Sequence, residues 1–262
     1  MASLQTLSGT GSLRVCADVL VKLGAVTELY LPKPSWGNHA KIFGAAGLEV
    51  REYGYLDKRG TALDFGLMAE DLGGLPAASV VLLHAAAHNP TGVDPTQAQW
   101  DQLAQLFASN SLVPLFDTAY QGFASGDCVR DAYPLRAFEA AGVNSILCQS
   151  FAKNMGLYGE RVGAIHIVCS NPEESQAVLS RVKQEVIRPN YSSPPRHGAE
   201  IAAEILNDEA LLGEWHAQLL TMSQRIKDVR TALRTELEQI GAPGNWNHIE
   251  EQIGEASRTV FW

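Results

Sequence analysis

The chain contains Ser79-Val80-Val81-Leu82-Leu83-His84, an apolar run of strand length. A helical pattern over residues 96–109 follows it, and a second apolar run covers residues 112–116. A strand that is apolar at successive positions is buried on both faces, and strands that alternate with helices pair in parallel. This segment therefore predicts a parallel sheet that is covered by helices on each face and joined by right-handed crossovers.

The same alternation extends through most of the chain. Further strands are expected at residues 28–31, 48–53, 145–150 and 164–169. Further helices are expected at residues 13–23, 38–46, 64–72, 133–141 and 172–186. The sequence thus indicates an α/β fold with a mostly parallel sheet between helices.

Beyond about residue 195 the strand signals end, and helical patterns cover residues 197–206 and about 208–240. A helix of about thirty residues would be about 45 Å long, which is longer than most helices of globular proteins. We expect it to link two lobes. The expected division is a large domain at residues 1–208, a linking helix at 209–241 and part of a small domain at 242–262.

The composition excludes several classes of protein. The 262 residues carry 20 Lys and Arg against 29 Asp and Glu, a formal net charge of −9, and 46% are hydrophobic. This apolar content argues against a disordered chain, and the acidic balance argues against nucleic acid as a partner. The four cysteines lack metal-ligand spacing, so we expect reduced thiols and no metal site.

No stretch of the sequence approaches the roughly 18 consecutive apolar residues of a membrane-spanning helix. The N-terminal residues also lack the layout of a signal peptide. We therefore expect no membrane partner, and a location in the cytoplasm or inside an organelle.

One edge of the expected sheet gathers polar residues. An amide, a carboxylate, a phenol, an amine and a guanidinium are supplied by Asn89, Asp117, Tyr120, Lys153 and Arg161. Taken singly, each has an ordinary structural explanation as a turn, a cap, a packing ring, a surface lysine or a surface ion pair. Ligands of open α/β sheets bind at this edge, so the coincidence favours a shared function.

A glycine-rich turn, Ser8-Gly9-Thr10-Gly11, opens the helical pattern at residues 13–23. Such a turn presents backbone N–H groups and the positive end of the helix dipole, so a phosphate is a natural ligand. No strand is expected before it and no acidic residue stands at the ribose position. A dinucleotide-binding fingerprint is therefore not supported.

One cofactor accounts for the whole set. Pyridoxal 5′-phosphate needs a lysine for its Schiff base, a carboxylate for its pyridine nitrogen, a donor for its phenolic oxygen and a cradle for its phosphate. The sequence offers all four.

The residues around the lysine resemble a known family. The lysine motif of aspartate aminotransferases, which are fold-type I pyridoxal-phosphate enzymes, strongly resembles Ser150-Phe151-Ala152-Lys153-Asn154-Met155-Gly156-Leu157-Tyr158-Gly159-Glu160-Arg161-Val162-Gly163. Residues 34–39, 87–92, 116–123 and 245–249 match the same family. The resemblance covers residues 7 to about 254.

The resemblance implies the catalytic roles. Lys153 would form the Schiff base and then move a proton between the substrate α-carbon and the cofactor C4′. Asp117 would keep the pyridine nitrogen protonated, so that the ring acts as an electron sink. His39 would lie behind Asp117 as its hydrogen-bond partner.

The resemblance also implies how the cofactor is held. Asn89 and Tyr120 would hydrogen-bond its phenolate oxygen, and Trp36 would stack on its ring. Trp36 and Asn89 would contact the substrate as well. The phosphate cradle would consist of Ser8, Gly9, Thr10, Ser150 and Arg161.

The reaction implied by the resemblance is the ping-pong exchange of L-aspartate and 2-oxoglutarate for oxaloacetate and L-glutamate. Arg188 would reach across a homodimer interface and pair bidentately with the distal carboxylate of these dicarboxylic amino and keto acids. The structural alternative is an arginine at a helix C-terminus. A related transaminase with aromatic substrates is an alternative function.

The chain departs from the family at both ends. The family has a further stretch before the position of Leu7, and beyond Gly254 it has a segment with the arginine that binds the substrate α-carboxylate. No residue here can be nominated for that arginine, so the alternative is a weakly active or inactive cofactor-binding fragment. The motif around Lys153 is more similar to the mitochondrial branch than to the cytoplasmic one.

Overall fold

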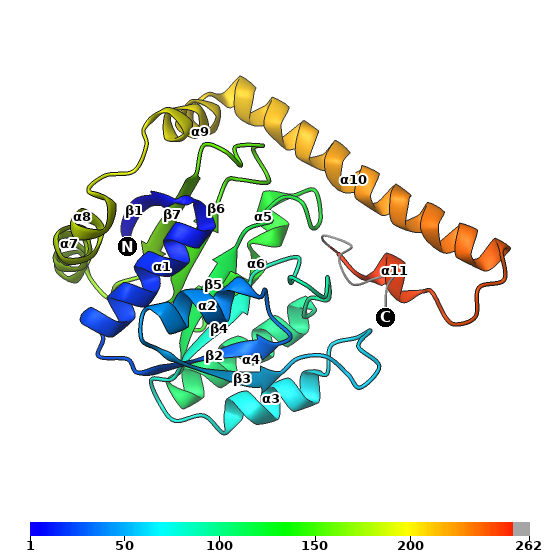
Figure 1. The fold of residues 1–262 in the computed structure, drawn as a ribbon, viewed down its shortest axis with the longest axis horizontal. Helices are drawn as coiled ribbons and strands as arrows, with labels where there is room; N and C mark the ends of the chain where they lie inside the picture. The colour runs from blue at the N-terminus through cyan, green and yellow to red at the C-terminus, as the bar shows by residue number, and fades with distance from the viewer. Residues whose placement is uncertain (254–262) are drawn as a thin grey trace.

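A mixed β-sheet forms the centre of the computed structural model, which describes residues 1–253 (Figure 1). The strand order is β1-β7-β6-β5-β4-β2-β3. β7 runs antiparallel to both of its neighbours, and the pairs among β2 to β6 are parallel. The strands are β1 (Ala2–Leu7), β2 (Glu28–Lys33), β3 (Glu49–Gly54), β4 (Val80–His84), β5 (Val113–Thr118), β6 (Ile146–Ser150) and β7 (Val162–Ile167). The predicted, mostly parallel α/β fold is confirmed.

Helices cover both faces of this sheet. One face carries α1 (Ser8–Lys22), α2 (Asn38–Ala45) and α7 (Pro172–Arg181). The other face carries α3 (Phe65–Gly73), α4 (Gln97–Asn110) and α6 (Tyr133–Ala140). An apolar cluster lies between the sheet and each helix layer.

The interior strand β4 contributes to both clusters. Val80 and Leu82 pack on the α1 side, whereas Val81 and Leu83 pack on the α4 side. Successive side chains of a strand point to opposite faces, so an uninterrupted apolar run is what a doubly covered strand requires.

Side-chain caps fix where several helices begin. Thr96 accepts a hydrogen bond from the Gln99 N–H, and the Gln99 side chain accepts one from the Thr96 N–H, which together form a capping box at α4. Asp64 caps α3 with a single hydrogen bond, which its side chain accepts from the Leu67 N–H. These starts agree with those expected from the sequence.

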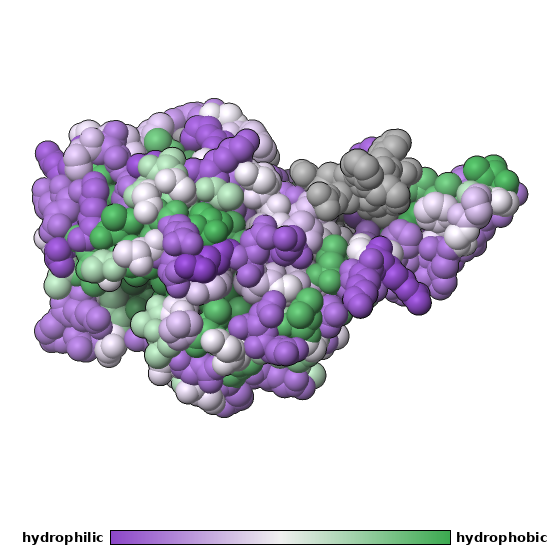
Figure 2. All heavy atoms as spheres, turned by 60° about the horizontal axis from the view of Figure 1, so that its bottom comes forward, coloured by the Kyte–Doolittle hydropathy of each residue, from purple (hydrophilic) through white to green (hydrophobic). Residues whose placement is uncertain are grey.

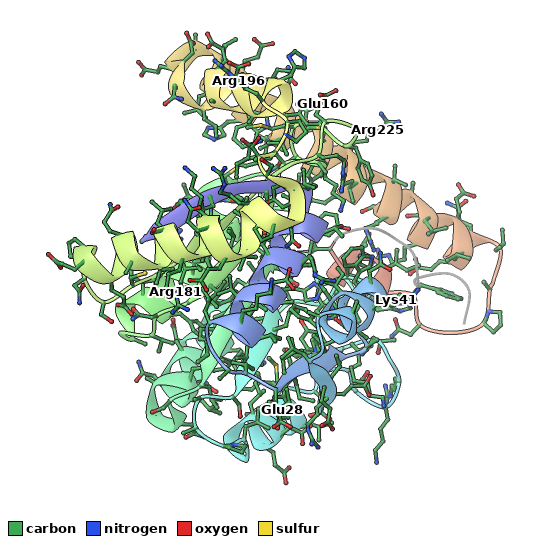
Figure 3. The ribbon with its side chains drawn as sticks, turned by 60° about the vertical axis from the view of Figure 1, so that its left-hand side comes forward. Glu28, Lys41, Glu160, Arg181, Arg196 and Arg225 are labelled. Carbon is green, nitrogen blue, oxygen red and sulfur yellow. The ribbon has the colours of Figure 1, made fainter. Side chains whose placement is uncertain are left out.

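The helix expected at residues 172–186 is longer and less regular than predicted. After α7 the chain continues as a π-helix, η1 (Val182–Ile187), and then as α8 (Arg188–Tyr191). Figure 3 shows these elements following one another as a rod beside α1. Buried Val182, Val186 and Ile187 point into the α1-side cluster, and the wider π turn lets residues five apart share that face.

The C-terminal part is helical, as expected. It consists of α9 (His197–Asn207), α10 (Glu209–Gln239) and the short α11 (His248–Glu251); the remaining short helix, α5 (Cys128–Asp131), follows β5. α10 has 31 residues and extends away from the sheet (Figure 1). In Figure 2 its far end projects from the body as a narrow extension. No helix within residues 1–253 has the length and apolar composition needed to cross a bilayer.

Three predictions about elements at the β1–β7 edge of the sheet were wrong. β1 precedes Ser8, where no strand was expected. Its mixed polar sequence gives little local signal, and its pairing with β7 joins residues that are far apart in the sequence. α1 begins at Ser8 rather than at residue 13, since the glycines lie within its first turns. β7 begins at Val162, two residues before the expected start.

Gly163 permits a close approach between three backbone segments. A Cβ at this position would lie 2.6 Å from the Gln149 carbonyl oxygen of β6 and 2.6 Å from the Ser8 carbonyl carbon at the start of α1. Neither backbone atom can move without displacing its element. The absence of a side chain at Gly163 therefore lets α1 begin directly beside the end of β6.

We predict that Gly163→Ala lowers the free energy of unfolding by about 1–3 kcal/mol, because the added methyl group clashes with backbone atoms. Gly213→Ala in α10 is the matched control, since a Cβ there meets nothing within 4 Å. It should raise stability by up to about 1 kcal/mol through helix propensity. Urea unfolding monitored by circular dichroism measures both; equal effects of the two substitutions would contradict the prediction.

Candidate active site

A pocket lies at the carboxyl ends of β4, β5 and β6. The sequence-predicted residues that line it are Ser8, Gly9, Thr10, Trp36, Asn89, Asp117, Tyr120, Ser150, Lys153 and Arg161. Leu13, His84, Ala86, Ala119, Ala152 and Tyr158 complete its lining. The structure thus brings together every proposed cofactor-contacting residue, although these residues span more than half of the chain.

The strand register explains part of this convergence. His84 of β4 is the register partner of Asp117 in β5, and Thr118 of β5 pairs with Gln149 in β6. Because of this parallel pairing, β4, β5 and β6 end side by side. The loops that follow them therefore meet at the same edge of the sheet.

Asp117 is held by a buried histidine. His39 Nε2 lies 2.9 Å from Asp117 Oδ2, and His39 Nδ1 lies 2.8 Å from Ser35 Oγ. An ionised carboxylate only accepts hydrogen bonds, so Nε2 donates to Asp117 and Nδ1 accepts from the Ser35 hydroxyl. Burial alone would raise the pKa of Asp117, but the hydrogen bond from His39 and the positive charge of Lys153 outweigh it and hold that pKa below its usual value. A carboxylate is thereby kept ionised in a mostly buried pocket.

His84 was not among the sequence-predicted site residues, although it lines the pocket. Burial lowers its pKa well below the usual value, so the ring is neutral. Its Nδ1 accepts from the Asn89 N–H at 3.3 Å, which leaves the proton on Nε2. Nε2 is buried and has no hydrogen-bond partner among residues 1–253. The place of His84 in the site follows from its strand register with Asp117, which the sequence pattern does not reveal.

Lys153 lies between two tyrosine rings. Its Nζ is 4.9 Å from the ring centroid of Tyr120 and 5.6 Å from that of Tyr158. Tyr158, another residue that sequence reasoning did not nominate, also lies beneath the Arg161 guanidinium at 5.7 Å. In the part of the chain that the structure describes, no carboxylate forms a salt bridge with Lys153. The amine therefore lies against two tyrosine rings, close enough to Asp117 for its charge to lower the pKa of that carboxyl.

The other end of the pocket is suited to an anion. Its wall includes Ser8, Gly9 and Thr10, the first residues of α1, and no side chain caps this helix start. Ser8 Oγ and Ser150 Oγ lie 3.0 Å apart, and Arg161, whose Nη1 donates to the Tyr158 carbonyl at 2.8 Å, also lines the pocket. Free N–H groups at a helix start, two hydroxyls and a guanidinium together form a binding site for a phosphate or similar anion.

Three non-glycine residues around the pocket have positive φ. These are Ser8 at 61°, Ala87 at 53° and Arg161 at 54°. The loop at Ala87 is held by Asp94, whose two carboxylate oxygens accept from the Ala87 and His88 N–H groups at 2.7 and 2.8 Å. Backbone held in this region concentrates at functional sites, so these positions agree with a binding role for the pocket.

Two predicted site residues lie outside the pocket. His39 is behind Asp117, as expected from the sequence. Arg188 is exposed at the start of α8 and does not line the pocket of its own chain. All four cysteines are free, and residues 1–253 contain no cluster of ligands that could hold a metal ion.

The chain and its fold are similar to known proteins. A family model for aminotransferase class I and II matches residues 1–257. The cytoplasmic aspartate aminotransferase of Oryza sativa subsp. japonica is 52% identical over 254 residues, which are 97% of this chain and 62% of that protein. The structure of a mitochondrial aspartate aminotransferase from Trypanosoma brucei has a TM-score of 0.93 at 42% identity, over 97% of this chain and 66% of that one.

A further similar structure is that of an aromatic-amino-acid aminotransferase from Burkholderia pseudomallei covalently bound to pyridoxal phosphate. Its TM-score is 0.93 at 40% identity, and the match covers 97% of this chain and 63% of that one. The chain thus spans less than two thirds of the length of each of these relatives. With the family model matching nearly all of its residues, the chain belongs to the class I and II aminotransferases.

Proposed function

We propose that this chain forms the cofactor-binding part of a pyridoxal-phosphate-dependent aspartate aminotransferase. The reaction would interconvert L-aspartate and 2-oxoglutarate with oxaloacetate and L-glutamate. The observation that carries the proposal is the single pocket in which Lys153 lies with the His39-bound Asp117 and an anion-binding helix start. Relatives named aspartate aminotransferase support the same reaction.

The residues present fit this cofactor. Lys153 would bind its aldehyde carbon, and Asp117 would face its pyridine nitrogen. His84 also lines the pocket, and within residues 1–253 its buried Nε2–H has no hydrogen-bond partner, as expected of a site built for a polar ligand. The phosphate would occupy the wall formed by the start of α1, with Ser150 and Arg161. When bound, the cofactor supplies an electron sink for the bond cleaved at the substrate α-carbon.

The chain's own residues would orient the reactants and move the proton. Asn89 and Tyr120 would donate hydrogen bonds to the phenolic oxygen of the cofactor. Trp36, which also lines the pocket, would stack on the cofactor ring. Lys153 would accept the proton from the substrate α-carbon. Its position between Tyr120 and Tyr158 keeps the amine within the pocket.

Substrate choice would require a second copy of the chain. Arg188 is exposed and lies outside the pocket of its own chain, so a homodimer in which it enters the partner's pocket agrees with its position. An arginine there would pair with the distal carboxylate of dicarboxylic substrates. Aromatic substrates remain the second candidate, because a similar structure is named for them.

The domain organisation is also part of the proposal. Residues 1–208 would form the cofactor domain, α10 within residues 209–241 would link it to a second domain, and residues 242–262 would begin that domain. Residues 254–262 of this last segment lie outside the described residues. The similarity of the lysine motif to the mitochondrial branch favours a mitochondrial over a cytoplasmic location, and relatives named for both compartments exist.

We predict that the purified chain mixed with pyridoxal phosphate shows the visible absorbance of a lysine-bound cofactor. Lys153→Ala should abolish this band, whereas Lys41→Ala, which removes an exposed lysine outside the pocket, should leave it unchanged. Absorbance spectra after gel filtration test this. A wild-type chain without the band would refute the proposed cofactor site, and a chain that binds the cofactor but converts no aspartate would support the fragment alternative.

We predict that Arg188→Ala slows the single-turnover reaction with aspartate roughly 100-fold, because a bidentate charged pair is lost. The reaction with phenylalanine should change little. Arg196→Ala provides the control, since Arg196 is an exposed arginine paired with Glu200 on α9 and is labelled in Figure 3. Equal losses for both substrates would instead assign Arg188 a structural role.

We predict that His39→Leu shifts the acid release of the cofactor to higher pH. The lowered pKa of Asp117 means that its charge is present above that pKa and is lost as the pH falls through it. Without the hydrogen bond from His39, the effect of burial, which raises the pKa of Asp117, is no longer offset as fully. The pKa therefore rises, and Asp117 loses its charge at a higher pH during acidification. A cofactor-retention titration measures this, and His166→Leu should behave as the wild type because His166 lies outside the pocket.

A further inference from the structure

Lys153 lies on a segment without regular secondary structure. The segment connects the end of β6 at Ser150 to the start of β7 at Val162. Neither strand ladder nor helix hydrogen bonds fix the lysine directly. The Lys153 carbonyl accepts a turn hydrogen bond from the Gly156 N–H at 3.1 Å, and contacts with other parts of the chain fix where this turn lies.

Asn154, the next residue, forms one such contact. Its side chain is buried at 2% exposure, and its Nδ2 donates to the Gln121 carbonyl at 3.0 Å. Gln121 directly follows Tyr120, whose ring faces the Lys153 amine at 4.9 Å. This hydrogen bond therefore joins the segment that carries the lysine to the segment that carries the tyrosine.

The orientation of the Asn154 side chain is imposed by this bond. A flipped amide would place Oδ1 against the Gln121 carbonyl, and two acceptors repel each other. In the observed orientation, Oδ1 is buried without a hydrogen-bond partner among residues 1–253. The structure thus keeps the contact to Gln121 although the other end of the amide is unsatisfied.

α10 contacts both segments from outside the sheet. The Trp215 indole Nε1 donates to the Asn154 carbonyl at 2.7 Å. One turn further along the helix, Leu219 is fully buried, and a Cβ on Gly122 would lie 2.7 Å from its Cδ1. In Figure 1 the loops after β5 and β6 lie beside α10. Trp215 and Leu219 share one face of the helix, so a movement of α10 would act on both loops.

We propose that Asn154 and Trp215 are positioning residues through which α10 sets the location of Lys153 relative to Tyr120. This inference rests on the proposed function, in which Lys153 binds the cofactor and moves the proton. The two hydrogen bonds connect in series: Trp215 to the Asn154 carbonyl, and the Asn154 side chain to Gln121. The helix that is expected to link two domains thereby controls the geometry of the amine.

The test uses the full chain loaded with pyridoxal phosphate. Trp215→Phe keeps an aromatic ring and removes only the N–H donor. Asn154→Ala removes the donor to Gln121. Trp246→Phe is the matched control, because the Trp246 indole donates to the Ala242 carbonyl at 3.3 Å, away from the pocket.

The measurements are the pH titration of the absorbance of the lysine-bound cofactor and the rate of cofactor dissociation. We expect Trp215→Phe and Asn154→Ala each to shift the titration midpoint and to speed dissociation roughly five-fold, as for the loss of one hydrogen bond. Trp246→Phe should match the wild type in both. A role limited to folding would lower the melting temperature without moving the titration midpoint.

Unchanged titration and dissociation in Trp215→Phe would overturn the inference while leaving the proposed function intact. If Asn154→Ala does not fold, Trp215→Phe alone decides, since it is the milder change. Loss of the lysine-dependent absorbance in the wild-type chain itself would instead refute the proposed function, and this inference with it.

Discussion

The shared level at which β4, β5 and β6 end is the constraint on which the rest of the site depends. His84 and Asp117 are register partners, so the ring and the carboxylate are placed side by side by strand pairing. The loops that carry Asn89, Tyr120 and Lys153 all leave the sheet from this edge. A slip of one residue in any of these pairings would exchange the two faces of a strand and remove its contribution to the pocket.

The second requirement is that charge be retained in a pocket with little solvent. Asp117 remains ionised because His39 donates to it, and His39 is in turn fixed by Ser35. The anion site depends on the backbone instead, since the N–H groups at the start of α1 supply partial positive charge. One end of the pocket therefore depends on a side-chain relay and the other on a helix terminus.

Much of this arrangement could be predicted from the sequence, because its signals are local. The apolar run of β4 predicted the parallel sheet, and the polar residues after the strands predicted Asn89, Asp117, Tyr120, Lys153 and Arg161 as part of the pocket lining. What was missed depends on long-range pairing. β1 has a mixed polar sequence and becomes a strand only through β7, while the place of His84 in the site follows from its register with Asp117. The predicted role of Arg188 cannot be checked within one chain for a similar reason, because it requires the pocket of a second copy.

The π-helical turn η1, which lies directly before Arg188, allows the fold to tolerate the deletion of one residue. A π turn holds one residue more than an α turn, so deleting one residue within 182–187 could be absorbed by conversion to α-helix. Because the extra residue lies inside that one turn, its removal would leave the residues beyond the turn, Arg188 included, facing in the same direction. A deletion within the α-helical turns of α7 would instead rotate every residue beyond it by about 100°, and with them the direction of Arg188.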